Sequence, residues 1–365
     1  MSKTSEYVTL GHPDKVADFI SEYILDRIIE IDPNVRYALE VQIKDYVVNL
    51  GGEITTCADV DDYNFETWAR EAVNKIGYTS EYAKNFGFDN TICGDRLEVN
   101  CYVSKQSSDI AQGVDRNAWG DQGIFFGMHS RETVTGDGWD YYLAKKLGQS
   151  LYYSFKVLET VVFGLDIKTQ VTVEGEENGC PIVKQVVVAV PMVRNTEANK
   201  DYIKGIVDDF LTHQSAFKAK DYECIVNGTG AYFTHASVGD CGTTGRKLVV
   251  DFYGSNCRIG GGSPWTKDGT KADLTLNLYA KDLAKSIFEQ REKDKRCAKV
   301  ETELSCCIGQ SKVRAVIKLL DEHGNVYETW EEYKDGLPNS LIAKYKLRQP
   351  IYAEMCEKGL FYFIQ

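Results

Sequence analysis

One hydrophobic pattern occurs three times along the chain: two strand-like segments followed by a helix-like segment. In the first copy, apolar residues alternate from Tyr37 to Ile43, as on a half-buried strand, and recur at helical spacing from Phe65 to Ile76. The predicted strands are 37–43 and 46–54, 171–173 and 182–190, and 299–307 and 313–320, and the predicted helices are 65–76, 201–211 and 340–345. A unit that recurs about every 130 residues is too long for a solenoid. The pattern therefore predicts an α/β fold of the α+β type, with three pseudo-symmetric subdomains around a shared axis, each a sheet backed by helices.

One predicted strand is apolar throughout. The run from Val186 to Val190 shows no alternation with polar residues, which indicates burial on both faces. Helices that back one face of a sheet leave its other face to be covered, and we expect a second subunit to cover it.

The composition is that of a globular protein. The 365 residues are enough for two or three domains, and no apolar run approaches the length that crosses a bilayer. The net charge of −12 argues against a general nucleic-acid surface, because phosphate backbones need clustered Lys and Arg. The 11 cysteines form no C-x-x-C pair, so we expect reduced core thiols and no zinc site. The first residues lack the apolar stretch of a signal peptide, and we expect a cytoplasmic protein.

The segment 11–15, with the sequence GHPDK, places an imidazole, a carboxylate and an ammonium at the start of a predicted helix. Pro13 suits the first helical turn, and apolar residues then recur at helical spacing from Val16 to Ile31. Free N–H groups and the helix dipole favour anions at this end, and Asp14 suits a hard cation that bridges phosphate oxygens. The alternative is a capped helix whose charged residues are solvated.

Two glycine-rich segments carry further basic residues. The first, 239–247 with the sequence GDCGTTGRK, lets backbone N–H groups approach a ligand closely, and it runs into a predicted strand at 248–253. It is not a P-loop, because five residues separate its outer glycines and a strand, not a helix, is predicted to follow. The second, 260–273, begins with three successive glycines and continues with Lys and Asp residues that open a predicted helix. The alternative is a glycine-rich bend beside a solvated helix start.

Seven collinear blocks resemble signatures of the S-adenosylmethionine synthetases (methionine adenosyltransferases). In chain order they are GHPDK at 11–15, GGEITT at 51–56, KQSSDIAQGVD at 105–115, GDQG at 120–123, DIKTQVTV at 166–173, GDCGTTGRK at 239–247 and GGGSPWTKDGTKAD at 260–273. The resemblance implies three pseudo-symmetric α/β domains whose spatial units exchange segments. The expected divisions are an N-terminal domain at 1–106, a gating loop at 107–120, a central domain at 121–233 and a C-terminal domain at 234–365.

The resemblance also implies a reaction. The methionine sulfur would displace triphosphate from the ribose 5′ carbon of ATP, and the triphosphate would then be hydrolysed to pyrophosphate and phosphate. His12 would donate to the departing 5′ oxygen, and the other catalytic residues would be the cations Lys168, Arg246, Lys247 and Lys267. The family pattern implies that these five residues bind ATP together with Asp121, Asp166, Tyr232, Asp240 and Ser263, with Tyr232 where an aromatic ring stacks on adenine.

By the same resemblance, the two charged ends and the apolar side chain of methionine would be bound by Glu53, Gln106, Asp240, Lys271 and Ile308. Asp14 and Asp273 would each hold one of two Mg²⁺ ions, and Glu40 would bind K⁺. The family builds its site between two subunits, so the resemblance implies a dimer or tetramer as well.

The sequence departs from the family pattern in three places. The gating loop is several residues shorter than in bacterial relatives, Ala231 stands where arginine is common, and the segment from Leu347 onward is shorter than the pattern. These departures bear on lid closure, nucleotide affinity and regulation. The alternatives are an idle paralogue that serves as a structural or regulatory subunit and another ATP-dependent transferase such as a kinase. The retained charged residues argue against the first, and the lack of Walker and kinase motifs argues against the second.

Overall fold

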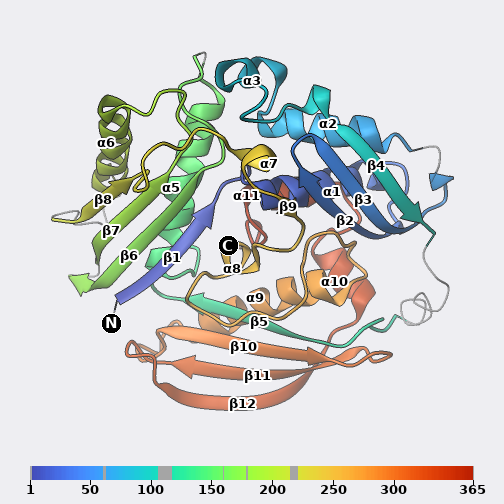
Figure 1. The fold of residues 1–365 in the computed structure, drawn as a ribbon. Coiled ribbons are helices and arrows are strands. Elements are labelled where there is room, and N and C mark those ends of the chain that lie inside the picture. Colours follow the sequence, from blue (N-terminus) through green and yellow to red (C-terminus); the bar gives the residue numbers. More distant parts are fainter. Residues whose placement is uncertain are drawn as a thin grey trace.

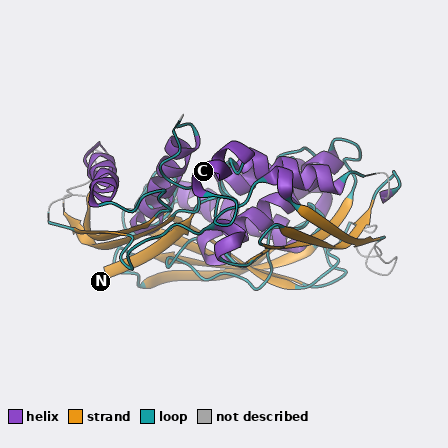
Figure 2. Cartoon of the chain, turned by 45° about the horizontal axis from the view of Figure 1, so that its top comes forward, coloured by secondary structure: helices purple, strands orange, loops and turns teal. Residues whose placement is uncertain are grey.

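The protein contains three four-stranded sheets, which surround a central group of helices in Figure 1. The structure is a computed structural model that describes residues 2–60, 63–105, 117–158, 160–177, 180–213 and 221–364. Figure 2 shows the helices on one side of the molecule and the strands on the other. The predicted α/β architecture, with three sheets backed by helices, is confirmed.

Each sheet contains a strand from a distant part of the chain. The first sheet has the order β1 (Ser2–Val8), β6 (Lys168–Glu177), β7 (Cys180–Ala189) and β8 (Glu223–Val226). The second has the order β4 (Glu98–Ser104), β3 (Val47–Thr55), β2 (Arg36–Lys44) and β9 (Gly242–Thr243). The third has the order β12 (Val326–Asp335), β11 (Lys312–Leu320), β10 (Lys299–Cys306) and β5 (Gly123–Ser130). The strands β1, β9 and β5 thus tie segments far apart in the sequence into one structure.

The helices fill the space between the sheets and cover one face of each. Their bounds are α1 (Pro13–Ile29), α2 (Phe65–Ile76), α3 (Ser80–Phe86), α5 (Trp139–Lys156), α6 (Glu197–His213), α7 (Ala236–Gly239), α8 (Leu248–Asp251), α9 (Ala272–Gln290), α10 (Pro338–Lys344) and α11 (Tyr352–Lys358), with a 3₁₀ turn η2 at Gly94–Arg96. Helix α5 packs on β1 and β6, α9 packs on β5 and β10, and α1 packs on β2, α2 and α11. Among the described helices, none is long and apolar enough to cross a membrane.

The predicted helix at 65–76 is confirmed with the same bounds. Asn64 caps its first turn by accepting the N–H of Thr67, and Gly77 ends it with a φ of 120°. The predicted strand at 248–253 is wrong, because Leu248–Asp251 is the short helix α8. The apolar residues of this segment favour a strand locally, but tertiary contacts override that preference. The helical turn buries Val250 and points the Asp251 carboxylate into the protein.

The apolar run in β7 is buried unevenly. Val186 and Val188 are fully buried, whereas Val187 and Ala189 on the other face are half-buried. Within this chain the sheet therefore has one covered face and one that keeps some exposure.

Only some of the cysteine thiols lie in the core. Every cysteine is a free thiol, and four of them are buried: Cys93, Cys297, Cys306 and Cys356. Three are exposed, namely Cys57, Cys101 and Cys307. The expectation of core thiols is wrong for these three, because strand edges and loops leave them open to solvent.

Candidate active site

The GHPDK segment lies at a helix start, as predicted. His12 is the N-cap of α1, and its Nδ1 accepts the N–H of Asp14 at 3.2 Å. Both side chains are buried, although they lie at the polar end of the helix. A buried carboxylate needs partners, and these come from the glycine-rich segment more than two hundred residues later.

Asp14 is held by three groups of that segment. Oδ1 accepts the backbone N–H of Thr243 at 2.9 Å and lies 3.2 Å from Nε of Arg246, and Oδ2 accepts from Nζ of Lys247 at 2.5 Å. Burial opposes ionisation of Asp14, but the hydrogen bonds from Lys247 and Thr243 outweigh it and lower the pKa of the carboxyl below its usual value. The structure therefore brings the two motifs together within one chain.

His12 is a neutral hydrogen-bond donor in this setting. Burial lowers the pKa of its imidazole, and the positive charges of Lys168 and Lys247 lower it further. Because Nδ1 accepts the N–H of Asp14, the neutral ring carries its proton on Nε2. The side chain can therefore donate from Nε2 to an oxygen that gains negative charge.

This arrangement predicts that His12 stays neutral from pH 5 to pH 8, because a lowered pKa keeps the ring unprotonated at every pH above it. Nitrogen-15 NMR of imidazole-labelled protein would show one protonated Nε2 and one bare Nδ1 across this range. Assignment would come from the spectrum of His12→Asn, which should lack only that ring. A His12 signal that titrates with a midpoint near the usual value of about 6.5 would contradict the prediction.

A cavity of about 190 Å³ opens beside His12. We call it the His12 pocket; its lining includes five residues predicted from the sequence, namely His12, Asp166, Lys168, Tyr232 and Asp240. Asp166 accepts the N–H of Ala236 at 3.1 Å through Oδ2. Burial raises the pKa of Asp166 to about 6, against the opposing effects of Tyr232 and Lys168. An aromatic ring, a cation and carboxylates thus surround one small cavity.

A second group of predicted residues lies at the start of α9. Nζ of Lys267 donates to Oδ2 of Asp273 at 2.5 Å, and Lys271 is the N-cap residue of the helix. Gly262 lies so close to Asp273 that an added Cβ would sit 2.0 Å from its Oδ1. A side chain at position 262 would therefore force the Asp273 carboxylate to move from its present place. We call Ser263, Lys267 and Asp273 the Lys267 group, and none of the three lines the His12 pocket.

Glu40 lies between the two glycine-rich segments. Its carboxylate accepts from the hydroxyl of Thr244 and, at 3.2 Å, from the hydroxyl of Thr266. Strand β2, which carries Glu40, pairs with β9 on one side and bridges to Lys267 through Ala38. One strand therefore positions both segments and leaves a carboxylate with two hydroxyls between them.

The remaining predicted residues lie elsewhere in this chain. Glu53 is near the end of β3, paired with Ala38. Asp121 and Ile308 lie near each other at one end of the third sheet, where the backbone oxygen of Asp121 contacts Sγ of Cys306 at 3.4 Å. None of these three predicted residues lines the His12 pocket. Gln106 and most of the predicted gating loop lie outside the described residues.

Three participants were missed from the sequence. The backbone N–H groups of Thr243 and Ala236 hold the carboxylates of Asp14 and Asp166, and His235 lines the His12 pocket. Backbone donors leave no signal in residue identity. His235 is one of only five histidines, which is a signal, but its ring is occupied by Tyr82, Thr91 and the carbonyl of Phe233 and so has a structural role.

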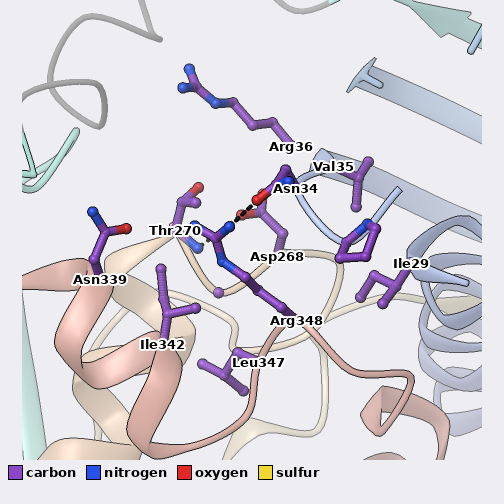
Figure 3. Close-up of a pocket in the computed structure, with 12 residues that line it drawn as sticks. Ile29, Asn34, Val35, Arg36, Asp268, Thr270, Asn339, Ile342, Leu347 and Arg348 are labelled. Atoms are coloured by element: carbon purple, nitrogen blue, oxygen red, sulfur yellow. Dashed lines mark hydrogen bonds between the residues drawn. The ribbon is translucent and has the colours of Figure 1, made fainter. Parts of the chain in front are cut away.

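Another cavity, of about 270 Å³, is lined in part by Asp268 and Thr270, which follow Lys267 in the chain (Figure 3). Arg348 is hydrogen-bonded to Asn34 beside it. Asp268 in its wall accepts the N–H groups of Tyr37 and Thr270, both at 2.8 Å. The Asp268 carboxylate therefore holds the turn between Lys267 and Lys271, and the cavity is not lined by any residue predicted for the site.

Three family models match consecutive parts of the chain. They describe the N-terminal, central and C-terminal domains of S-adenosylmethionine synthetase and match residues 1–108, 116–232 and 234–363. The chain belongs to the S-adenosylmethionine synthetase family. A solved structure described as an unusual S-adenosylmethionine synthetase from Campylobacter jejuni is similar as well, with a TM-score of 0.85 and 28% sequence identity over 99% of this chain and 94% of that chain. The resemblance stated from the seven blocks is therefore confirmed at the level of the S-adenosylmethionine synthetase family.

Proposed function

We propose that the protein makes S-adenosylmethionine from ATP and L-methionine and then hydrolyses the triphosphate to pyrophosphate and phosphate. The observation that carries the proposal is the His12 pocket, which gathers residues from three distant motifs around one cavity. Tyr232 offers a face for adenine, Asp166 and Asp240 offer acceptors for the nucleoside and the methionine ammonium, and Lys168 offers a charge for the triphosphate. Family membership supports the same reaction.

The chain's own residues suit the displacement step. A thioether is a weak, neutral nucleophile, so the site must orient it in line and stabilise the negative charge that grows on the leaving oxygen. His12 can donate from Nε2 to the 5′ oxygen without first gaining a proton. Lys168, Arg246 and Lys247 bind the triphosphate through fixed positive charges, which need no rearrangement as the bond breaks.

The donor groups fit the two metal ions that the family implies. Magnesium is commonly held by one or two carboxylates together with substrate phosphates and water, and Asp14 and Asp273 each supply one carboxylate that is now paired with a lysine. Among the described residues, no three His, Cys, Asp or Glu side chains form a protein-only metal cage. When bound, Mg²⁺ would neutralise triphosphate charge. The oxygens of Glu40, Thr244 and Thr266 fit a potassium ion in the same way.

The arrangement also supports a site shared between two subunits. Lys267 and Asp273 are paired with each other, and no member of the Lys267 group lines the His12 pocket, although both sets of residues are assigned to one triphosphate. A dimer or tetramer that places the Lys267 group of one protomer against the His12 pocket of another would complete the site. The partly exposed face of β7 is a surface that such an assembly could cover. We place this assembly in the cytoplasm.

The test is direct. Pure protein is incubated with ATP, methionine, Mg²⁺ and K⁺, and mass spectrometry is used to look for the sulfonium product while pyrophosphate and phosphate are assayed. We expect S-adenosylmethionine with one pyrophosphate and one phosphate for each molecule formed. Release of ADP would identify a kinase. Binding of ATP with no sulfonium product would identify an idle structural or regulatory subunit.

A further inference from the structure

One face of helix α1 is charged and yet buried. Four charged residues follow one another along α1 at spacings of three or four residues and therefore share one face of the helix: Lys15, Asp18, Glu22 and Asp26. Their exposed fractions are 3%, 0%, 0% and 6%. Burying four ionisable side chains is costly unless each has partners, and the partners reveal what the face does.

Two of these carboxylates accept backbone N–H groups in the glycine-rich segments. Asp18 Oδ1 accepts the N–H of Gly245 at 2.9 Å, and Glu22 Oε1 accepts the N–H of Thr266 at 2.6 Å. Gly245 has a φ of 71° and Thr266 a φ of 72°. Each residue directly precedes a cation assigned to the triphosphate: Arg246 follows Gly245, and Lys267 follows Thr266. Two successive turns of α1 thus hold two backbone bends of positive φ, one at Gly245 and one at Thr266.

The bend at Thr266 is strained. A β-branched residue rarely adopts a positive φ, because its side chain crowds the backbone, and such a conformation persists only where surrounding contacts impose it. Thr266 is 1% exposed, and Glu22 and Glu40 hold its N–H and its hydroxyl. The neighbouring Trp265 is fixed by its indole N–H, which donates to Asp251 Oδ2 at 2.7 Å.

Lys15 balances the charge beneath these bends. Its ammonium lies 3.0 Å from Asp18 Oδ2 and 2.7 Å from Asp251 Oδ1, and it sits 4.5 Å from the centre of the Trp265 ring. Burial opposes the charge on Lys15, but Asp18 and Asp251 outweigh it and raise the pKa of Lys15 well above its usual value. The ammonium therefore links the helix to both bends.

We propose that Asp18 and Glu22 are positioning residues of the triphosphate site, and that Glu22 sets the place of Lys267 by holding Thr266 in its left-handed conformation. This inference rests on the proposed function. Neither carboxylate touches a substrate; each acts through the cation that follows the bend it holds. In the proposed dimer, helix α1 therefore positions Arg246 for one active site and Lys267 for the other.

The experiment compares two substitutions at one position. Glu22→Leu removes the acceptor, and we expect kcat for S-adenosylmethionine formation to fall about 10- to 100-fold, since a displacement of about 1 Å can cost that much. Glu22→Gln keeps an acceptor of the same length, because its amide oxygen can accept the N–H of Thr266 in place of Oε1. We expect Glu22→Gln to stay within about threefold of the wild-type kcat.

Asp26 provides the matched control. It belongs to the same buried face and accepts two backbone N–H groups, those of Tyr352 and Ala353 at 2.9 Å, but no predicted site residue follows them. We expect Asp26→Leu to lower the melting temperature and to leave kcat of the folded protein unchanged. An equal loss of kcat in Glu22→Leu and Asp26→Leu would show a general structural effect and overturn the proposal.

A double-mutant comparison separates positioning from stability. If Glu22 acts through Lys267, then adding Glu22→Leu to Lys267→Met should lower kcat no further, whereas independent effects would multiply. If Glu22→Leu does not fold, Asp18→Leu, which removes the acceptor of the Gly245 N–H, makes the same comparison at the other bend in the presence and absence of Arg246→Met, and multiplied effects there would overturn the proposal. A wild-type protein without activity would refute the proposed function instead, so the two failures are distinct.

Discussion

Lys247→Met is expected to lower kcat for S-adenosylmethionine formation by about 10²–10³-fold, the range found when one donor to a transition-state charge is removed. Lys247 lies 2.5 Å from Asp14, and its charge also lowers the pKa of His12. Its loss would remove a proposed triphosphate ligand and leave the buried Asp14 carboxylate with Arg246 and the Thr243 N–H. His12→Asn should cause a loss of the same order, because it removes the proposed donor to the 5′ oxygen.

The measurement is a steady-state assay of the sulfonium product with each purified variant. Lys204→Met is the matched control, because Lys204 lies on α6 in an exposed ion pair with Asp201 and such pairs contribute little. Asp14→Asn combined with Lys247→Met should cost less than the product of the single effects, since the two side chains contact each other. Activity of Lys247→Met within a few-fold of the wild type would reject its assignment.

Two inactive variants should restore activity when they are coexpressed, provided that each alters a different half of a shared site. The proposed halves are the His12 pocket and the Lys267 group, so His12→Asn and Lys267→Met form the test pair. Random pairing makes half of the dimers mixed, and each mixed dimer has one unaltered site. We therefore expect about a quarter of the wild-type activity, against almost none for either variant alone.

Asp14→Asn and Lys247→Met form the control pair for this experiment. The two side chains contact each other within one chain, so every site of a mixed dimer would contain an altered residue. No recovery is expected from this pair. If the test pair also fails to recover, or if light scattering shows a fully active monomer, the shared site is refuted.

The sequence is enough to predict elements whose apolar residues recur at regular spacing, and segments rich in glycine and charged residues. The apolar spacing predicts the helix at 65–76, and the family resemblance implies that GHPDK and GDCGTTGRK contribute to one site, where the structure places Asp14 against Thr243. Both signals are local, or depend on residue types that few structural roles require. The strand predicted at 248–253 fails because its contacts are not local: Asp251 must reach Lys15 and Trp265.

The charged face of α1 could not be recognised in advance. Polar residues at helical spacing normally mark the solvated side of a helix, and nothing in the order of Lys15, Asp18 and Glu22 departs from that pattern. They are buried because segments more than two hundred residues later fold over them. Backbone donors such as the N–H of Thr266 are equally invisible, since every residue except proline carries one.

The exchange of strands between the sheets has a consequence for synthesis. Strand β1 pairs with residues 168–174 of β6, so about 160 residues must follow Val8 before its partner exists. At the usual rate of roughly 5–20 residues per second, this segment waits on the order of ten seconds or more on the ribosome with its edge unpaired. Fragments cut at the borders of the three matched domains would share this defect permanently, because the sheet of the central region would lack β1. The protein should therefore fold as one unit late in translation, and its isolated thirds should aggregate rather than fold.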